Sequence, residues 1–281
     1  MKSAVLLLAH GAPERIEDVE RYLSFVRGGQ AVSPRVLEEV TNRYAAIGGS
    51  SPLTRWTRAQ AEALETLIGL PVFFGMRNWH PFVKETMEQV RAAGVDRLAC
   101  VCLAPQFSEM SVGLYMKHAR EAAGAIELAW AHSYHAEPLL IEAFAERLQG
   151  MPGKVLFTAH SLPSPNDVYD AESRATASAV AARLGLADWE FAYQSQGMSG
   201  GTWLGPTVES CVERYAADGI RDLVIAPIGF VCDHVEILYD IDVHFRELAA
   251  ACGIRILRPE SLNGSSTFTR ALAKVAGRCL A

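Results

Sequence analysis

The chain has 281 residues, of which 50% are hydrophobic and 21% are charged, a composition that excludes a disordered protein. Its net charge of −6 and the lack of any Lys/Arg run argue against binding to nucleic acid through the phosphates. The first apolar run, residues 4–9, is far shorter than the roughly 20 residues that span a membrane. No signal-peptide cleavage site follows that run. We therefore expect a cytoplasmic protein without a transmembrane segment.

Short apolar runs alternate along the chain with longer amphipathic stretches. The runs predict strands at 4–9, 71–75, 97–103, 126–131, 155–159, 190–193, 223–226 and 254–257. The stretches predict helices at 16–26, 34–46, 58–68, 81–93, 141–148, 171–184, 208–218, 235–251 and 266–278. Strands that are apolar on both faces and alternate with helices are typical of an α/β protein with parallel sheets covered on both sides.

One motif occurs twice in the sequence. Residues 5–13 form an apolar run followed by Ala-His-x-x-Pro, and residues 155–163 repeat this pattern. Residues 103–107 and 225–230 form a second pair, in which Ala-Pro follows a predicted strand and precedes a Phe. Because ligands of open parallel sheets bind beyond the carboxyl ends of the strands, these motifs would face one central cleft.

The repeat predicts two similar doubly wound halves. We place the first at residues 1–125 and the second at residues 126–262. Residues 263–281 would form a C-terminal helix that packs back on both halves.

Two groups of polar residues in these segments are candidates for chemistry. His160 directly follows a strand, where an imidazole can act as a general base or a metal ligand. Capping of its own turn explains His160 equally well. In a helix, Glu236, Asp240 and His244 would share one face and could pass a cation or protons towards the cleft. A capping box at 233–236 or a solvated helix face is the simpler explanation for this row.

Three further patterns are weaker. The turn at 48–51 offers backbone N–H groups to an anion, and Arg27 and Arg43 could pair with carboxylates. Residues 197–201 fit the G-x-S-x-G pattern around a nucleophilic Ser199, but no helix follows directly, so a plain turn is favoured. The six cysteines form no CxxC pair, which argues against a cysteine-ligated zinc or iron–sulfur site.

Eight motifs carry a family resemblance over nearly the whole chain. In order they are LAHGAP (8–13), RYAAIGGSSPL (43–53), GMRNWHP (75–81), LAPQFS (103–108), TAHSLP (158–163), YQSQG (193–197), WLGP (203–206) and PIGFVCDHVE (227–236). Together they resemble the ferrochelatase family. The resemblance implies two Rossmann-like domains of the class II chelatase type around a central cleft. It also implies an enzyme, a metal chelatase (lyase), that inserts Fe²⁺ into a porphyrin in haem biosynthesis.

The resemblance assigns a role to each candidate residue. It makes His160 a proton acceptor or metal ligand and Glu236 the opposing carboxylate that binds the metal and relays protons. Asp240 and His244 would extend this row of metal ligands, although His244 stands where an acidic residue is expected. The positions expected to bind the porphyrin are His10, Arg27, Arg43, Tyr44, Ser51 and Tyr115.

The same resemblance defines the expected ligands and the alternatives. Fe²⁺ is a substrate, and neither a tightly bound cofactor nor an iron–sulfur cluster is expected. We expect a monomer whose partners are the porphyrin and ferrous iron, with a transient contact to a membrane or a haem acceptor left open. The porphyrin is coproporphyrin III or protoporphyrin IX, with a slight preference for the former. The alternatives are a cobalt or nickel chelatase acting on sirohydrochlorin and a non-catalytic haem or porphyrin carrier.

Overall fold

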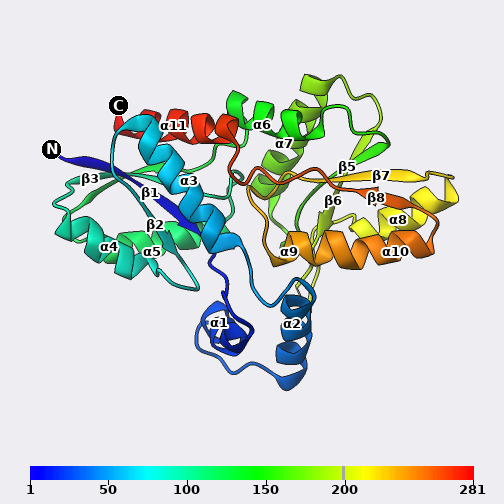
Figure 1. Ribbon diagram of the computed structural model, residues 1–281, viewed down its shortest axis with the longest axis horizontal. Coiled ribbons are helices and arrows are strands. Elements are labelled where there is room, and N and C mark those ends of the chain that lie inside the picture. Colours follow the sequence, from blue (N-terminus) through cyan, green and yellow to red (C-terminus); the bar gives the residue numbers. More distant parts are fainter. Residues whose placement is uncertain (198–199) are drawn as a thin grey trace.

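The computed structural model describes residues 1–197 and 200–281. Two four-stranded parallel sheets form the body of the molecule (Figure 1). The strands of the first sheet, in spatial order, are β2 (Val72–Met76), β1 (Ser3–Ala9), β3 (Arg97–Cys102) and β4 (Glu127–Ala131). Those of the second sheet are β6 (Trp189–Gln194), β5 (Lys154–His160), β7 (Asp222–Pro227) and β8 (Arg255–Leu257). Both sheets thus use the same strand order, which confirms two similar Rossmann-like halves. Strand β4 belongs to the first sheet, although the predicted boundary after residue 125 assigns it to the second half.

All eight predicted strands are present, and every strand end lies within one residue of its predicted position. Helices cover both faces of each sheet (Figure 1). The helices before residue 150 are α1 (Val19–Val26), α2 (Pro34–Ala46), α3 (Leu53–Ile68), α4 (Val83–Ala92), α5 (Leu114–Ala123) and α6 (Pro138–Leu148). Those after it are α7 (Asp167–Leu184), α8 (Val208–Ala217), α9 (Val235–Leu238), α10 (Arg246–Ala251) and α11 (Ser266–Leu280). None of the helices described is long and apolar enough to cross a membrane.

Helix α3 begins at Leu53, five residues before its predicted start, and two further helix predictions need larger corrections. The predicted list omits the π turn η2 (Glu109–Gly113) and the helix α5 that follows it, because a glycine inside a helical stretch weakens its periodic signal. The single helix predicted at 235–251 is three pieces, in which the π turn η3 (Asp240–Phe245) separates α9 from α10. A π turn accommodates an extra residue, so residues four apart no longer share a face across it.

The two halves share one apolar core. The largest cluster of buried side chains includes Leu7 of β1, Phe157 of β5 and Phe268 of α11. Helix α11 packs against α3, α6 and β3, and so lies across both halves. Apart from this body, α1 and α2 form a small lobe, residues 16–46, which lies at the bottom of Figure 1. Tyr22 and Tyr44 of the lobe belong to a separate apolar cluster with Trp79.

Gly229, just after β7, lies too close to β5 to tolerate a side chain. A Cβ atom at this position would lie 2.8 Å from the Cβ of Ala159 and 2.9 Å from its Cα. We expect Gly229→Ala to lower the free energy of unfolding by about 1–3 kcal/mol, because the end of β5 must shift. Urea unfolding measures this loss. Gly277→Ala is the matched control, since no atom within 4 Å opposes its Cβ, and an equal midpoint for both variants would contradict the prediction.

Glu190 on β6 bridges two cations at the edge of the second sheet. Its carboxylate accepts hydrogen bonds from Arg214 of α8, and Lys154 of β5 lies 3.2 Å away. The bond from Arg214 outweighs the effect of burial and lowers the pKa of Glu190 to about 2. The stabilisation is therefore complete above the unfolded-state pKa of 4.5 and is lost as the pH falls towards 2.

Glu190→Gln should consequently destabilise the protein at pH 7 and hardly at all at pH 2.5. We expect less than about 1 kcal/mol at pH 7, because the carboxylate is one-third exposed and water screens the pair. The difference between the urea midpoints of the two proteins, followed from pH 7 to pH 2.5, measures the effect. A difference that does not change with pH would count against this account.

Candidate active site

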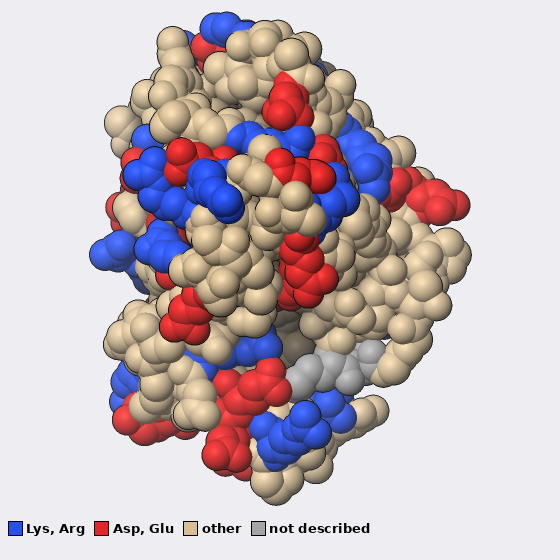
Figure 2. All heavy atoms as spheres, turned by 90° about the vertical axis from the view of Figure 1, so that its right-hand side faces the viewer, with Lys and Arg blue, Asp and Glu red and all other residues tan. Residues whose placement is uncertain are grey.

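A cavity of about 270 Å³ lies between the two halves and the lobe. Its wall contains residues that directly follow β1, β3, β5 and β7, together with Tyr22 and Tyr44 of the lobe. The carboxyl ends of these strands therefore meet at one cleft, as the motifs predict. In the space-filling view a recess opens above the lobe, and acidic and basic side chains are interspersed around it (Figure 2).

His160 and Glu236 meet in the wall of this cavity. His160 is the last residue of β5, and its Nε2 lies 3.0 Å from Oε1 of Glu236 on α9. The other ring nitrogen, Nδ1, donates to the carbonyl oxygen of Ser161, which fixes the orientation of the ring. The two candidates, 76 residues apart in the sequence, thus form one hydrogen-bonded pair.

The contacts of the His160–Glu236 pair favour its ionised form. Burial opposes the charge on both groups, but the attraction between them and their hydrogen bond outweigh it. As a result the pKa of His160 is raised and that of Glu236 is lowered. Both shifts favour an imidazolium beside a carboxylate in the cavity wall.

Two other histidines face the same cavity and are neutral. Burial lowers the pKa of His10 to about 4, and its Nε2 lies 3.1 Å from the amide nitrogen of Asn78. Burial also lowers the pKa of His234, whose Nε2 lies 3.7 Å from Oε2 of Glu236. Three residues of the site were not predicted from the sequence. Arg77 and His234 line the cavity, and Asn78 contacts His10 behind it. The available signal was their place inside the GMRNWHP and CDHVE motifs.

Asp240 does not line the cavity and contacts the lobe. It accepts a hydrogen bond from the hydroxyl of Ser195, and Nη1 of Arg43 on α2 lies 3.6 Å from its Oδ1. Burial and then the charge of Glu236 raise the pKa of Asp240 to about 6, against the effects of Ser195 and Arg43. Asp240 therefore connects the segment that carries Glu236 to the lobe.

His244 lies apart from this group. Its side chain is half-exposed, and its Nε2 lies 3.7 Å from Oε1 of Glu209 on α8. The π turn at 240–245 explains why the predicted single row does not form on one helix face. Among the residues described, no three His, Cys, Asp or Glu side chains are arranged to hold a metal ion together. The metal-ligand roles of Asp240 and His244 stay predictions.

The ferrochelatase family model matches residues 2–279 of the chain. The chain belongs to the ferrochelatase family. The ferrochelatase of Acidobacterium capsulatum is 44% identical to it, over 98% of this chain and 94% of its own. The coproporphyrin III ferrochelatase of Mycobacterium ulcerans is 36% identical, over 95% of this chain and 84% of its own.

A solved structure shares the fold. SirB from Bacillus subtilis with Fe³⁺ superposes with a TM-score of 0.65 at 12% identity, covering 100% of this chain and 96% of that one. At this identity the likeness establishes the architecture alone, a class II chelatase fold with two sheets.

The residues predicted to bind the porphyrin in a ferrochelatase are placed differently with respect to the cavity. His10, Tyr44 and Tyr115 line it. The Ser51 hydroxyl lies just behind the wall, where it accepts a hydrogen bond from the backbone of Leu53.

The two predicted arginines lie outside the cavity wall. Arg43 lies at the junction of the lobe and α9–η3, where its guanidinium is 5.5 Å from the centre of the Tyr239 ring. Arg27 is exposed just after α1. Ser199, the nucleophile of the weak serine-hydrolase alternative, lies outside the described residues.

Proposed function

We propose that this member of the ferrochelatase family inserts Fe²⁺ into a porphyrin. The observation that carries the proposal is the ionised His160–Glu236 pair in the wall of a cavity built from both halves. A carrier needs a cavity and an axial ligand, but it has no use for a buried carboxylate paired with a protonated base. Two exchangeable charges side by side suit a reaction in which a dication enters and protons leave.

The chemistry of the pair follows from its charges. Glu236 offers a carboxylate, a ligand that ferrous iron accepts. When Fe²⁺ binds that carboxylate, the attraction that keeps His160 protonated is lost, and the imidazole releases its proton to solvent. The neutral Nε2 then accepts a proton from a pyrrole N–H, and the vacated pyrrole nitrogen binds the iron. The second pyrrole proton leaves in the same way after His160 has discharged the first.

Metal insertion also requires a deformed macrocycle, and the cavity wall imposes this deformation. A flat porphyrin keeps its nitrogen lone pairs in the ring plane, where an incoming metal cannot reach them. A rigid wall that binds the bent ring better than the flat one stabilises the state from which insertion occurs. Tyr44, Tyr115 and Met110 contribute broad apolar contacts to this wall.

We propose coproporphyrin III as the porphyrin, with protoporphyrin IX as the alternative. The relatives named for coproporphyrin III cover nearly the whole of this chain, which supports the choice. Arg77 in the cavity wall and Arg43 in the lobe are cations suited to substrate carboxylates.

Anaerobic metallation by the purified protein tests both proposals. Fe²⁺ is added to coproporphyrin III, protoporphyrin IX or sirohydrochlorin, and absorbance follows the change from free base to metal complex. We expect turnover with a porphyrin, fastest with coproporphyrin III. Turnover with sirohydrochlorin alone would favour the sirohydrochlorin chelatase alternative. Stoichiometric porphyrin binding without turnover would identify a carrier.

A further inference from the structure

Gln194 connects the two strands behind the His160–Glu236 pair. It is the last residue of β6, it lies opposite His160 in the register of β5 and β6, and only 1% of it is exposed. Its backbone carbonyl accepts a hydrogen bond of 2.7 Å from the N–H of Ser161. The main chain of Gln194 thus fixes the chain directly after His160.

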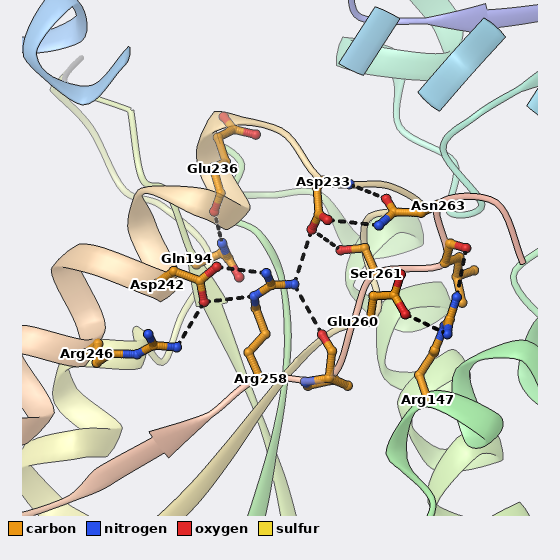
Figure 3. Close-up of polar contacts among 12 residues, drawn as sticks. Arg147, Gln194, Asp233, Glu236, Asp242, Arg246, Arg258, Glu260, Ser261 and Asn263 are labelled. Atoms are coloured by element: carbon orange, nitrogen blue, oxygen red, sulfur yellow. Dashed lines mark hydrogen bonds and ion pairs between the residues drawn. The ribbon is translucent and has the colours of Figure 1, made fainter. Parts of the chain in front are cut away.

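The side chain of Gln194 reaches the other member of the pair. Its Nε2 donates to the backbone carbonyl of Glu236 over 2.8 Å (Figure 3). Its Oε1 accepts from the hydroxyl of Thr158 over 2.7 Å. This orientation of the amide is set by chemistry, because the carbonyl oxygen of Glu236 can only accept a hydrogen bond. A single buried amide therefore bridges the β5 strand of His160 and the α9 helix of Glu236.

The segment that carries Glu236 depends on such external ties. Helix α9 has only four residues and runs into a π turn, so its own hydrogen bonds fix little of its position. Arg258 holds the two ends of the segment by pairing with Asp233 and Asp242 (Figure 3). Gln194 is hydrogen-bonded to Glu236, which lies between these two ends and carries the chemistry.

We propose that Gln194 is a positioning residue that holds Glu236 Oε1 at 3.0 Å from His160 Nε2. The inference rests on the proposed function, because it assigns Gln194 to the metal-insertion step. Gln194 is not part of the cavity wall, so its loss should alter the geometry of the pair and leave porphyrin contacts intact. Loss of the Gln194 amide should therefore lower turnover without changing the affinity for the porphyrin.

Gln194→Met tests the proposal, because methionine keeps the volume and removes the side-chain hydrogen bonds to Glu236 and Thr158, together with a longer one of 3.4 Å to Ser195. Two readouts are needed: the turnover with Fe²⁺ per porphyrin-binding site, counted by fluorescence titration, and the Kd for the porphyrin. We expect turnover per site to fall at least tenfold, with the Kd within twofold of the original protein. A merely structural role would reduce the number of binding sites and leave turnover per site unchanged.

Two other variants calibrate this result. Thr158→Val removes the hydrogen bond at Oε1 but keeps the tie to Glu236, and should lose less than threefold. Gln89→Met, on the exposed face of α4, makes the same chemical change far from the cavity and should alter neither readout. If Gln194→Met does not fold, Gln194→Asn retracts the same amide by one methylene and serves instead.

NMR of the His160 ring gives a readout that does not depend on turnover. The proton on Nε2 should give a downfield, hydrogen-bonded signal in the original protein and in Gln89→Met, and lose it in Gln194→Met. Turnover per site within threefold of the original protein, or an unchanged His160 signal in Gln194→Met, would overturn the inference. If the original protein metallates no tetrapyrrole, the proposed function fails, and the His160 signal still decides the positioning role.

Discussion

Glu236→Gln should abolish metal insertion while leaving porphyrin binding within a few fold of the original protein. Glutamine has the same shape, but it can neither bind a cation as a carboxylate nor keep His160 protonated. General acid–base catalysis contributes about 10²–10⁴-fold, so we expect a loss of at least about 100-fold in turnover. Anaerobic absorbance assays with Fe²⁺ give the rate, and quenching of protein fluorescence gives the porphyrin Kd.

His160→Ala should produce a similar loss, and the double variant should lose little more than either single one. Residues that act as a unit show such non-additivity. Glu142→Gln is the control, since that carboxylate pairs with Arg183 on the surface, away from the cavity wall. Full activity in either site variant would show that the pair does not carry the chemistry.

Arg258→Met should cause the largest loss of stability. Arg258 donates two hydrogen bonds to Asp242 and one to Asp233, and its side chain is only 13% exposed (Figure 3). Removing the guanidinium leaves the largely buried carboxylate of Asp233 without a cation and leaves Asp242 paired only with the half-exposed Arg246. Breaking a buried ion pair in this way costs about 3–5 kcal/mol, which urea unfolding at pH 7 would detect.

The neighbouring Arg246 provides a matched control for Arg258. It also pairs with Asp242, but 53% of its side chain is exposed. Arg246→Met should therefore change the free energy of unfolding by about 1 kcal/mol at most. Equal losses of unfolding free energy in the two arginine variants would contradict the claim that burial makes the ion pairs of Arg258 more stabilising than those of Arg246.

The body of the fold could be predicted because its strands carry a strong and simple signal. Strand β1 is apolar on both faces, and β5 repeats it down to the His that follows, so both the sheets and their facing ends can be inferred from sequence. The resemblance identifies His160 and Glu236 as site residues but places them on opposing walls, whereas in the structure their side chains are hydrogen-bonded to each other. Each of these predictions depends on local sequence patterns or on the order of motifs.

The remaining features depend on contacts that local patterns do not encode. The π turn at Asp240 coincides with contacts of its carboxylate to Ser195 and Arg43, which come from distant parts of the chain. The orientation of His10 depends on Asn78, which is 68 residues away. A periodic pattern cannot reveal that a helix contains an extra residue, or which amide lies beside a histidine.

The shared apolar core has a consequence for how the molecule unfolds. Although the sequence is duplicated, Leu7 and Phe157 belong to one cluster that α11 completes through Phe268. Neither half can melt without exposing apolar surface of the other, so heating should give a single cooperative calorimetric transition. The distance between the His160 wall and the His10 wall is thus fixed by the core. The lobe of α1 and α2 is therefore the part that must move to admit a large flat ligand.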